Sequence, residues 1–316
     1  MGDPAGIGPE IIVRALAGPG SIQDCLPVVI GDRKVLEEAI SLTGVRLGIR
    51  LIHDPGDANV SHTDLNLIEI PAVSFKKSRA TAEGGRASVK FIEKAVQLAL
   101  DKKVDAVVTA PITKEALKLA GLSWPGHTEM LAEMTGTKDY AMLLSGGPLR
   151  VILTTIHTSI KSVPELITHD TVLKTIRLAK KACGMLGIEN PKIAVAGLNP
   201  HAGEAGMFGE EERTAIIPAI EAAKAEGIPC SGPYPPDTLF HKAYNGGIDI
   251  IVCMYHDQGL IPLKMIAFDK GVNTTIGLPI IRTSPDHGTA YDISWKGLAN
   301  PSSMIEAMLL AQKLRI

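Results

Sequence analysis

Short hydrophobic runs alternate with stretches of helical apolar spacing along almost the whole chain. The spacing is clearest in 82–101, where Val89, Ile92 and Val96 recur three or four residues apart. We expect strands at 26–32, 105–112, 151–156, 193–200 and 250–255, and helices from about 33 and at 82–101, 113–121, 170–186, 211–226 and 299–313. Strands that alternate with helices predict an α/β fold with a largely parallel sheet.

Three of the hydrophobic runs end at a histidine, namely His157, His201 and His256. The carboxyl ends of parallel strands lie at the sheet edge where ligands bind. Three imidazoles meeting there would hold a divalent metal ion and leave one position open. A single histidine after a strand is more often structural, but the shared position of all three favours a metal site. Nitrogen ligands favour zinc, cobalt or nickel over manganese or magnesium.

Composition narrows the class of protein. A chain of 316 residues with 45% hydrophobic and 21% charged residues is typical of a globular protein of two domains. The net charge of −2 gives no sign of a nucleic-acid partner. We expect no membrane segment, since no apolar stretch approaches the roughly 18 residues required. The start lacks signal-peptide blocks and the four cysteines lack CxxC spacing, so we expect a reduced, cytoplasmic compartment.

The chain opens on a glycine-rich loop, GDPAGIGPE, that leads into a helix near Pro9. Free N–H groups at such a helix start favour anions, although a tight structural turn is equally compatible. Asp3 and Glu10 would face either a cleft or solvent. The loop is not the GxGxxG dinucleotide fingerprint. A strand normally precedes such a loop, and we expect one that this sequence does not contain.

Further polar residues are candidates for anion binding. His127 and Thr128 lie at an expected helix start in PGHTEM, where they would bind phosphate or carboxylate or only cap the helix. Lys264, Asn273 and Arg282 lie in apolar, loop-rich sequence, where an unpaired charge is costly. Lys264 follows Asp257 by about two helical turns if that segment is helical. In PPDTLF, a rigid loop would hold Asp237 as a hydrogen-bond acceptor or a turn cap.

The ordered motifs GDPAGIGPE, GHTE, GLNPHAGE, PPDTLF, MYHDQG, GVNTTIGLP and IRTSPDHGTA resemble those of the 4-hydroxythreonine-4-phosphate dehydrogenase family of vitamin B6 biosynthesis. The segment DHGTAYDISWKGLANPSSMI is also similar to the cofactor loop of isopropylmalate and isocitrate dehydrogenases. The resemblance implies their fold, in which two α/β domains flank a central cleft and NAD binds without a Rossmann module. It implies a terminal domain of 1–125 plus 273–316 with the cofactor loop. A middle domain of 126–272 would carry the metal site and the dimer contacts.

The same resemblance assigns residues to roles. It places the metal on His157, His201 and His256, in a homodimer whose sites are completed by both subunits. It implies substrate contacts at His127, Thr128, Asp237, Asp257, Lys264, Asn273 and Arg282. It implies cofactor contacts at Asp286, His287, Gly288, Asp292 and Asn300.

These assignments predict an NAD-dependent, metal-dependent oxidative decarboxylation of 4-phosphooxy-L-threonine to 3-amino-2-oxopropyl phosphate and CO2. The metal, with zinc expected first, would activate the hydroxyl and then stabilise the enolate. Asp237 or Asp257 would act as base or orienting group, and Lys264 would protonate the enolate or hold phosphate.

Other readings remain open at this point. The same chemistry on 4-phospho-D-threonate or 4-phospho-D-erythronate would give dihydroxyacetone phosphate, and the family also includes an enzyme acting on a cyclic diol carboxylate. A metal-dependent hydrolase or aldolase would use the three histidines without a nicotinamide. A non-catalytic sensor of a phosphorylated ligand would not need them.

Overall fold

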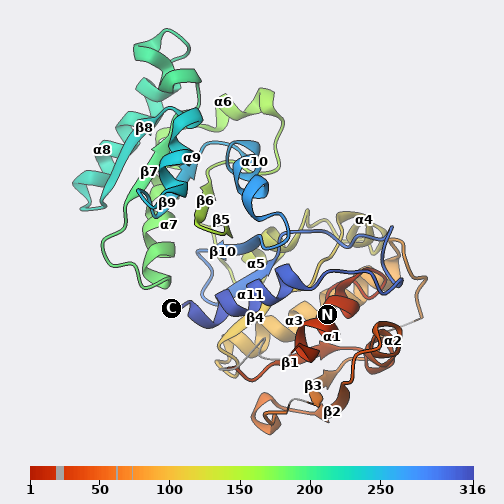
Figure 1. The fold of residues 1–316 in the computed structure, drawn as a ribbon. Coiled ribbons are helices and arrows are strands. Elements are labelled where there is room, and N and C mark those ends of the chain that lie inside the picture. Colours follow the sequence, from red (N-terminus) through yellow and green to blue (C-terminus); the bar gives the residue numbers. More distant parts are fainter. Residues whose placement is uncertain (19–24, 62, 73) are drawn as a thin grey trace. The chain divides into compact units, whose positions relative to one another are not determined.

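The computed structural model describes residues 1–18, 25–61, 63–72 and 74–316 (Figure 1). The chain forms two compact units. Unit 1 comprises Met1–Thr137 and Leu278–Lys313, and unit 2 comprises Lys138–Gly277 and Leu314–Ile316. Both terminal regions thus contribute to unit 1, and the unit limits lie at 137 and 277, where 125 and 272 were expected. The last three residues belong to unit 2.

Unit 1 contains two groups of parallel strands and the helices that pack on them (Figure 1). In one group β3 lies between β1 and β2, and in the other β4 pairs with β11. The elements of unit 1 are α1 (Gly8–Ala17), β1 (Val28–Gly31), α2 (Arg33–Thr43), β2 (Gly48–Ile52), η1 (Pro55–Asp57), β3 (Asp64–Glu69), α3 (Ala82–Leu100), β4 (Ala106–Val108), α4 (Lys114–Leu119), α5 (His127–Met134), β11 (Ile281–Pro285) and α11 (Ser302–Lys313).

Local sequence explains the helix limits of unit 1. The Asp32 carboxylate accepts a hydrogen bond from the Val35 N–H at the start of α2, and the helix ends at Gly44, whose φ of 67° favours glycine. Thr81 caps α3 by accepting from the Gly84 N–H. The Asn300 side chain accepts from the Ser302 N–H just before α11, which begins at Ser302 rather than at Pro301. Burial of the apolar faces then fixes the helices on the strands.

Unit 2 is built on six strands in the order β10-β5-β6-β9-β7-β8 (Figure 1). The strands β6, β9, β7 and β8 are parallel to one another, whereas β5 is antiparallel to β6 and β10. The elements of unit 2 are β5 (Ala141–Gly146), β6 (Leu149–Leu153), η2 (Ile160–Ser162), α6 (Val163–Leu166), α7 (His169–Met185), β7 (Ile193–Ala196), η3 (Pro200–Gly206), η4 (Glu212–Ile216), α8 (Ile217–Ala225), β8 (Cys230–Tyr234), α9 (Pro236–Tyr244), β9 (Ile250–Cys253), α10 (His256–Ala267) and β10 (Val272–Ile276).

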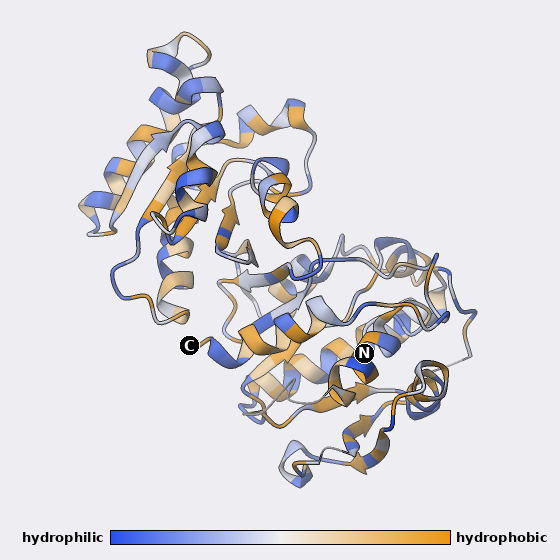
Figure 2. Cartoon of the chain, in the orientation of Figure 1, coloured by the Kyte–Doolittle hydropathy of each residue, from blue (hydrophilic) through white to orange (hydrophobic). Residues whose placement is uncertain are grey.

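The core of unit 2 confirms the buried parallel strands expected from the apolar runs. Every residue of β7 and β9 is buried, and both strands are mainly hydrophobic (Figure 2). Cys253 is fully buried among Leu153, Leu260 and Leu263, so it is a core residue. The observed strands are shorter than the apolar runs, because β4 ends at Val108 and β7 at Ala196. Among the described residues, no helix combines the length and the apolar character that crossing a membrane requires.

Candidate functional site

The three strands that precede the histidines are neighbours in the sheet of unit 2. Strand β9 lies between β6 and β7 and is parallel to both, which confirms the predicted arrangement. The backbone stays paired beyond the strands, since the Thr154 N–H donates to the Cys253 carbonyl at 2.8 Å and the Thr155 N–H to the Met254 carbonyl at 3.2 Å. The segments that end at His157 and His256 therefore leave the sheet together.

His157 and His256 lie side by side. Their ring centroids are 5.8 Å apart, with the ring planes at 44°. His256 is the first residue of α10, and its Nδ1 lies 2.7 Å from Oδ1 of Asp257. A carboxylate on one ring nitrogen orients the imidazole and leaves Nε2 for a metal ion. The contact makes Asp257 an orienting residue for His256.

His201 lies in an unusual left-handed segment. All five residues His201–Ala205 have positive φ between 40° and 81°, which non-glycine residues rarely adopt. The buried carboxylate of Glu212 holds the base of this segment, accepting from the N–H groups of Leu198 and Asn199 at 2.8 and 2.7 Å. Glu212 therefore sets where His201 lies, a role that no sequence motif indicated.

Gln258 links the ends of β9 and β7. Its buried side chain accepts from the Met254 N–H and donates to the Gly197 carbonyl, both at 2.7 Å. This amide fixes the start of α10, and hence His256, against the segment that leads to His201. Sequence analysis did not single out Gln258, because nothing in the motif MYHDQG distinguishes this glutamine from other polar residues.

Within the described residues, one chain does not bring the three histidines into a single group. Across the described ranges, no three His, Cys, Asp or Glu side chains are grouped closely enough to hold a metal ion. One chain thus supplies the adjacent pair His157 and His256, while His201 is presented separately on its left-handed segment. The three-ligand site remains a prediction.

The other predicted residues of unit 2 lie on helices and on β10. Asp237 is exposed in the first turn of α9, so the expectation of a rigid loop at this position is wrong. Two prolines at the helix start, Pro235 and Pro236, explain the difference, because proline fits the first turn of a helix. Lys264 and Asp257 both lie on α10, two turns apart as expected. Asn273 lies on β10 with Oδ1 buried and without a hydrogen-bond partner in the described chain.

Unit 1 brings together His127, Thr128 and Arg282. The first two open α5, as predicted, and Thr128 is buried. Arg282 on β11 is 1% exposed, and its Nη2 donates to Oγ1 of Thr109 at 2.7 Å. Nε2 of His127 is buried and has no partner within the described residues. Buried polar atoms of this kind are normally satisfied, so His127 is suited to bonding a ligand.

Burial and charge set the protonation of this cluster. Burial, together with the nearby charge of Arg282, holds the pKa of His127 well below 6.5. Burial also lowers the pKa of Arg282 to about 9. At neutral pH the cluster therefore presents a neutral imidazole beside a guanidinium cation, which is the charge state that binds a phosphate or carboxylate.

We expect the lowered pKa of His127 to make stability depend on pH. The folded state resists protonation that the unfolded chain accepts below pH 6.5, so stability is fully present above 6.5 and falls as the pH falls. Urea unfolding of the wild type and of His127→Asn at several pH values tests this. Below pH 6.5, each pH unit should lower the unfolding free energy of the wild type by about 1.4 kcal/mol relative to that of the variant. Equal pH dependence of the two proteins would contradict this assignment.

The opening loop and the expected cofactor segment pack against each other inside unit 1. Glu10 is fully buried, and its carboxylate accepts from the N–H groups of Trp295 and Gly297, the latter at 2.9 Å. Asp3 is also fully buried and accepts from the Tyr291 hydroxyl at 2.6 Å. The GDPAGIGPE motif thus shapes segment 286–300, and neither carboxylate faces solvent.

The predicted cofactor residues lie on this supported segment. Asp286 and Asn300 flank it, and their bonds to Ser303 and Ser302 join it to the start of α11. His287, Gly288 and Asp292 are exposed along the segment. The surface is accessible as a cofactor site requires, and the contacts with NAD remain a prediction.

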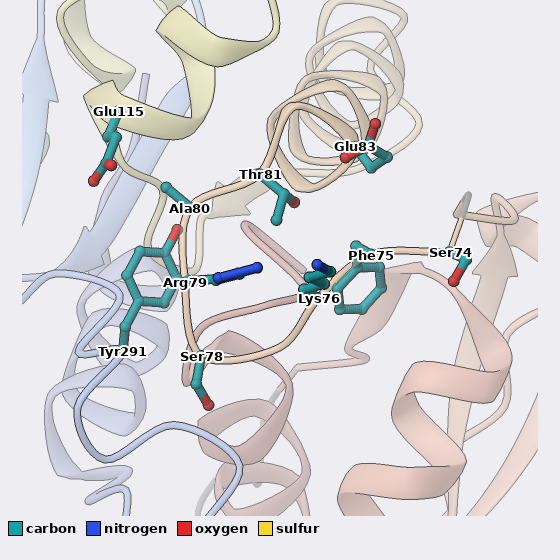
Figure 3. A pocket seen from close by; sticks show the side chains of 10 residues that line it. All are labelled: Ser74, Phe75, Lys76, Ser78, Arg79, Ala80, Thr81, Glu83, Glu115 and Tyr291. Atoms are coloured by element: carbon teal, nitrogen blue, oxygen red, sulfur yellow. The ribbon is translucent and has the colours of Figure 1, made fainter.

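A cavity of about 670 Å³ opens beside this segment in unit 1 (Figure 3). Its wall is formed by Ser74, Phe75, Lys76, Ser78, Arg79, Ala80, Thr81, Glu83, Glu115 and Tyr291. Only Tyr291 belongs to a motif that sequence analysis singled out. The loop 74–81 carries no recognisable spacing, so no sequence motif pointed to it.

Comparisons with known proteins agree with the resemblance drawn from the motifs. A family model described as "Pyridoxal phosphate biosynthetic protein PdxA" matches residues 23–311. A 4-hydroxythreonine-4-phosphate dehydrogenase from Desulforapulum autotrophicum is 49% identical, covering 98% of this chain and 93% of that protein. A D-threonate 4-phosphate dehydrogenase from Pectobacterium atrosepticum is 44% identical, covering 99% of this chain and 97% of that protein.

Solved structures give the same picture. The crystal structure of 4-hydroxythreonine-4-phosphate dehydrogenase from Klebsiella pneumoniae superposes with a TM-score of 0.92 at 44% identity, covering 99% of this chain and 96% of that chain. An isocitrate dehydrogenase from Methylococcus capsulatus is similar in fold alone, with a TM-score of 0.50 at 16% identity, covering 99% of this chain and 83% of that chain. The predicted fold class is thereby confirmed.

Proposed function

Because the chain belongs to the PdxA family of pyridoxal phosphate biosynthetic proteins, we propose that it oxidises and decarboxylates 4-phosphooxy-L-threonine to 3-amino-2-oxopropyl phosphate and CO2 with NAD. The observation that carries the proposal is the delivery of His157 and His256, side by side, from adjacent parallel strands. The four cysteines are free, in keeping with a reduced, cytoplasmic compartment.

The metal proposed here is a divalent ion, with zinc first and cobalt, nickel, magnesium or manganese as alternatives. His157 and His256 of one chain would hold it, with Asp257 orienting His256. His201 of a second copy would complete the set, because no third ligand joins the pair within the described chain. When bound, the ion would supply Lewis acidity at the substrate oxygen, and the nicotinamide would accept the hydride.

A homodimer is part of this proposal. Helix α10, which begins at His256, and the residue that ends it, Phe268, expose an apolar stripe. The stripe is formed by Ile261, Met265 and Phe268, which are 61%, 87% and 76% exposed. These residues are three or four positions apart and so lie on one face of the helix. Large apolar side chains exposed together mark interaction surfaces. A second copy would cover the stripe of the same helix that presents a metal ligand.

The remaining side chains would bind the substrate and transfer protons to and from it. In unit 1, the Arg282 cation and the buried Nε2 of His127 are suited to an anionic group of the substrate, with Thr128 beside them. In unit 2, the unbonded Oδ1 of Asn273 would accept from a substrate hydroxyl or amine. Lys264 is the proposed proton donor to the carbon that loses CO2. Asp237 remains the alternative base, since its carboxylate is exposed on α9.

A substrate panel tests this function. The purified enzyme with zinc and NAD is expected to form NADH with 4-phosphooxy-L-threonine. The alternative substrates are 4-phospho-D-threonate and 4-phospho-D-erythronate, which would give dihydroxyacetone phosphate, and the D-threonate 4-phosphate dehydrogenase among the relatives supports including them. A higher kcat/KM with either would reassign the substrate within the family. Absence of NADH with all three would favour a hydrolase or aldolase instead.

A further inference from the structure

The side chain of Gln258 lies just beyond the paired parts of β7 and β9. Backbone pairing of these parallel strands is in register as far as Val195 and Val252. Beyond that point, the Gln258 amide accepts from the Met254 N–H and donates to the Gly197 carbonyl, both at 2.7 Å. One side chain thus takes the place of a peptide group between the two strand ends, because it offers an acceptor to one and a donor to the other.

This amide bridge is enclosed by the core of unit 2. Gln258 is 7% exposed, Met254 is fully buried, and Gly197 is buried as well. A buried backbone N–H or carbonyl without a partner destabilises the fold, so the amide stabilises both strand ends. Methionine has a similar size but no N–H, and glutamate has the acceptor without the donor. Among these three side chains of similar size, glutamine alone makes both bonds.

On the β9 side, the amide bridge fixes the start of α10. Met254 lies two residues before His256, the first residue of this helix. The Met254 carbonyl is held too, since it accepts from the Thr155 hydroxyl at 2.8 Å. Gly259 lets the first turn of α10 approach the sheet, because a Cβ there would meet side-chain atoms of β6 and β9 at 3.1 Å. The backbone that carries His256 is therefore fixed on several sides.

On the β7 side, the amide bridge reaches His201 through a segment that is held along its length. A Cβ on Gly197 would lie 2.8 Å from Cα of Ala202, so the chain turns back closely on itself here. The Ala202 N–H donates to the Asn199 carbonyl at 3.1 Å, and Glu212 accepts from the Asn199 N–H at 2.7 Å. A shift of the Gly197 carbonyl would therefore be passed on to His201.

We propose that Gln258 is a positioning residue for both metal sites of the dimer, because its amide joins the backbone of His256 to the backbone of His201. The inference rests on the proposed function, in which one chain gives His256 to one site and His201 to the other. The bridge lies within one chain, yet it connects ligands of two different ions. Residues that orient metal ligands without touching the metal typically change metal affinity by about 10- to 100-fold.

The test isolates the effect of Gln258 on His201. A parent heterodimer pairs a His256→Ala chain with a wild-type chain, so one complete metal site remains. That site takes His201 from the variant chain and His157 and His256 from the wild-type chain. Adding Gln258→Met to the variant chain removes both bonds of the amide bridge. Zinc titration against a competing chromophoric chelator is expected to show Kd raised by about 10- to 100-fold over the parent heterodimer.

Two further substitutions in the same chain separate positioning from general stability. Thr175→Val is the matched control, because Thr175 is 1% exposed on α7 and its hydroxyl donates to the Thr171 carbonyl at 2.8 Å. This substitution also removes a buried hydrogen bond from unit 2, and it should leave the zinc Kd unchanged even if Tm falls. Gln258→Glu keeps the acceptor and loses the donation to Gly197. It should raise the zinc Kd as well, and it provides the test if the methionine variant does not fold.

The outcomes separate this inference from the proposed function. A raised zinc Kd for the Gln258 variants, with an unchanged Kd for Thr175→Val, supports the inference. A Kd within twofold of the parent heterodimer for the folded Gln258 variants overturns it and leaves the shared metal site standing. A parent heterodimer that binds no zinc, like a wild-type dimer that binds none, overturns the metal site of the proposed function and the inference with it.

Discussion

A heterodimer of His201→Ala and His256→Ala chains should recover about half of the wild-type activity, from one intact metal site in each dimer. Each variant alone should lose metal and about 10³-fold or more in kcat, since a metal supplies several kcal/mol to such a step. The physical reason is that, among the described residues of one chain, His157 and His256 lie together without a third ligand. His201 would reach the metal of the other copy. Differently tagged chains, co-expressed and purified through both tags, provide the heterodimer.

The matched control pairs His157→Ala with His256→Ala. Both substitutions damage the ligand pair contributed by the same chain, so every site of this heterodimer lacks one ligand and no activity returns. His53→Ala, an exposed histidine of unit 1, should leave activity and metal content unchanged. If the first heterodimer stays inactive, the three histidines do not combine across two copies as proposed. Metal analysis of each variant shows whether activity is lost together with the ion.

Replacing Arg282 with methionine should lower kcat/KM for the phosphorylated substrate by about 10²- to 10³-fold, since a charged hydrogen bond and a counter-charge are both lost. Stability should be unchanged or should rise. Burial lowers the pKa of Arg282 to about 9, which means that the folded protein holds this charge at a cost. Methionine fills a similar volume without that cost. Thermal unfolding and steady-state kinetics on one preparation test both parts.

The pH dependence and a conservative variant sharpen the Arg282 test. Substrate affinity of the wild type should begin to fall as the pH approaches about 9, the value to which burial lowers the pKa of Arg282. Arg282→Lys keeps a charge but not the planar fork, so it should retain part of the affinity. A clear drop in Tm for Arg282→Met would show instead that Arg282 has mainly a structural role through Thr109.

Much of the site was predictable because it follows strand order and local spacing. Apolar runs ending at His157, His201 and His256 predicted parallel strands with a shared edge, and β6, β9 and β7 have that arrangement. The start of α5 at His127 is also a local feature. By contrast, Asp237 was expected in a loop and lies in a helix, because the two prolines there are as compatible with a helix start as with a turn.

The sequence by itself determined the α/β alternation, the three histidines after buried strands and the family, since each depends on residues close together in the chain. Only the tertiary structure decided which polar groups share a site. Glu212 shaping the segment of His201, Gln258 joining two strand ends, and the Asp3–Tyr291 and Glu10–Trp295 contacts all connect residues that lie in different elements. Hydrophobic periodicity encodes which residues are buried, whereas polar pairing depends on the distances that packing sets between elements.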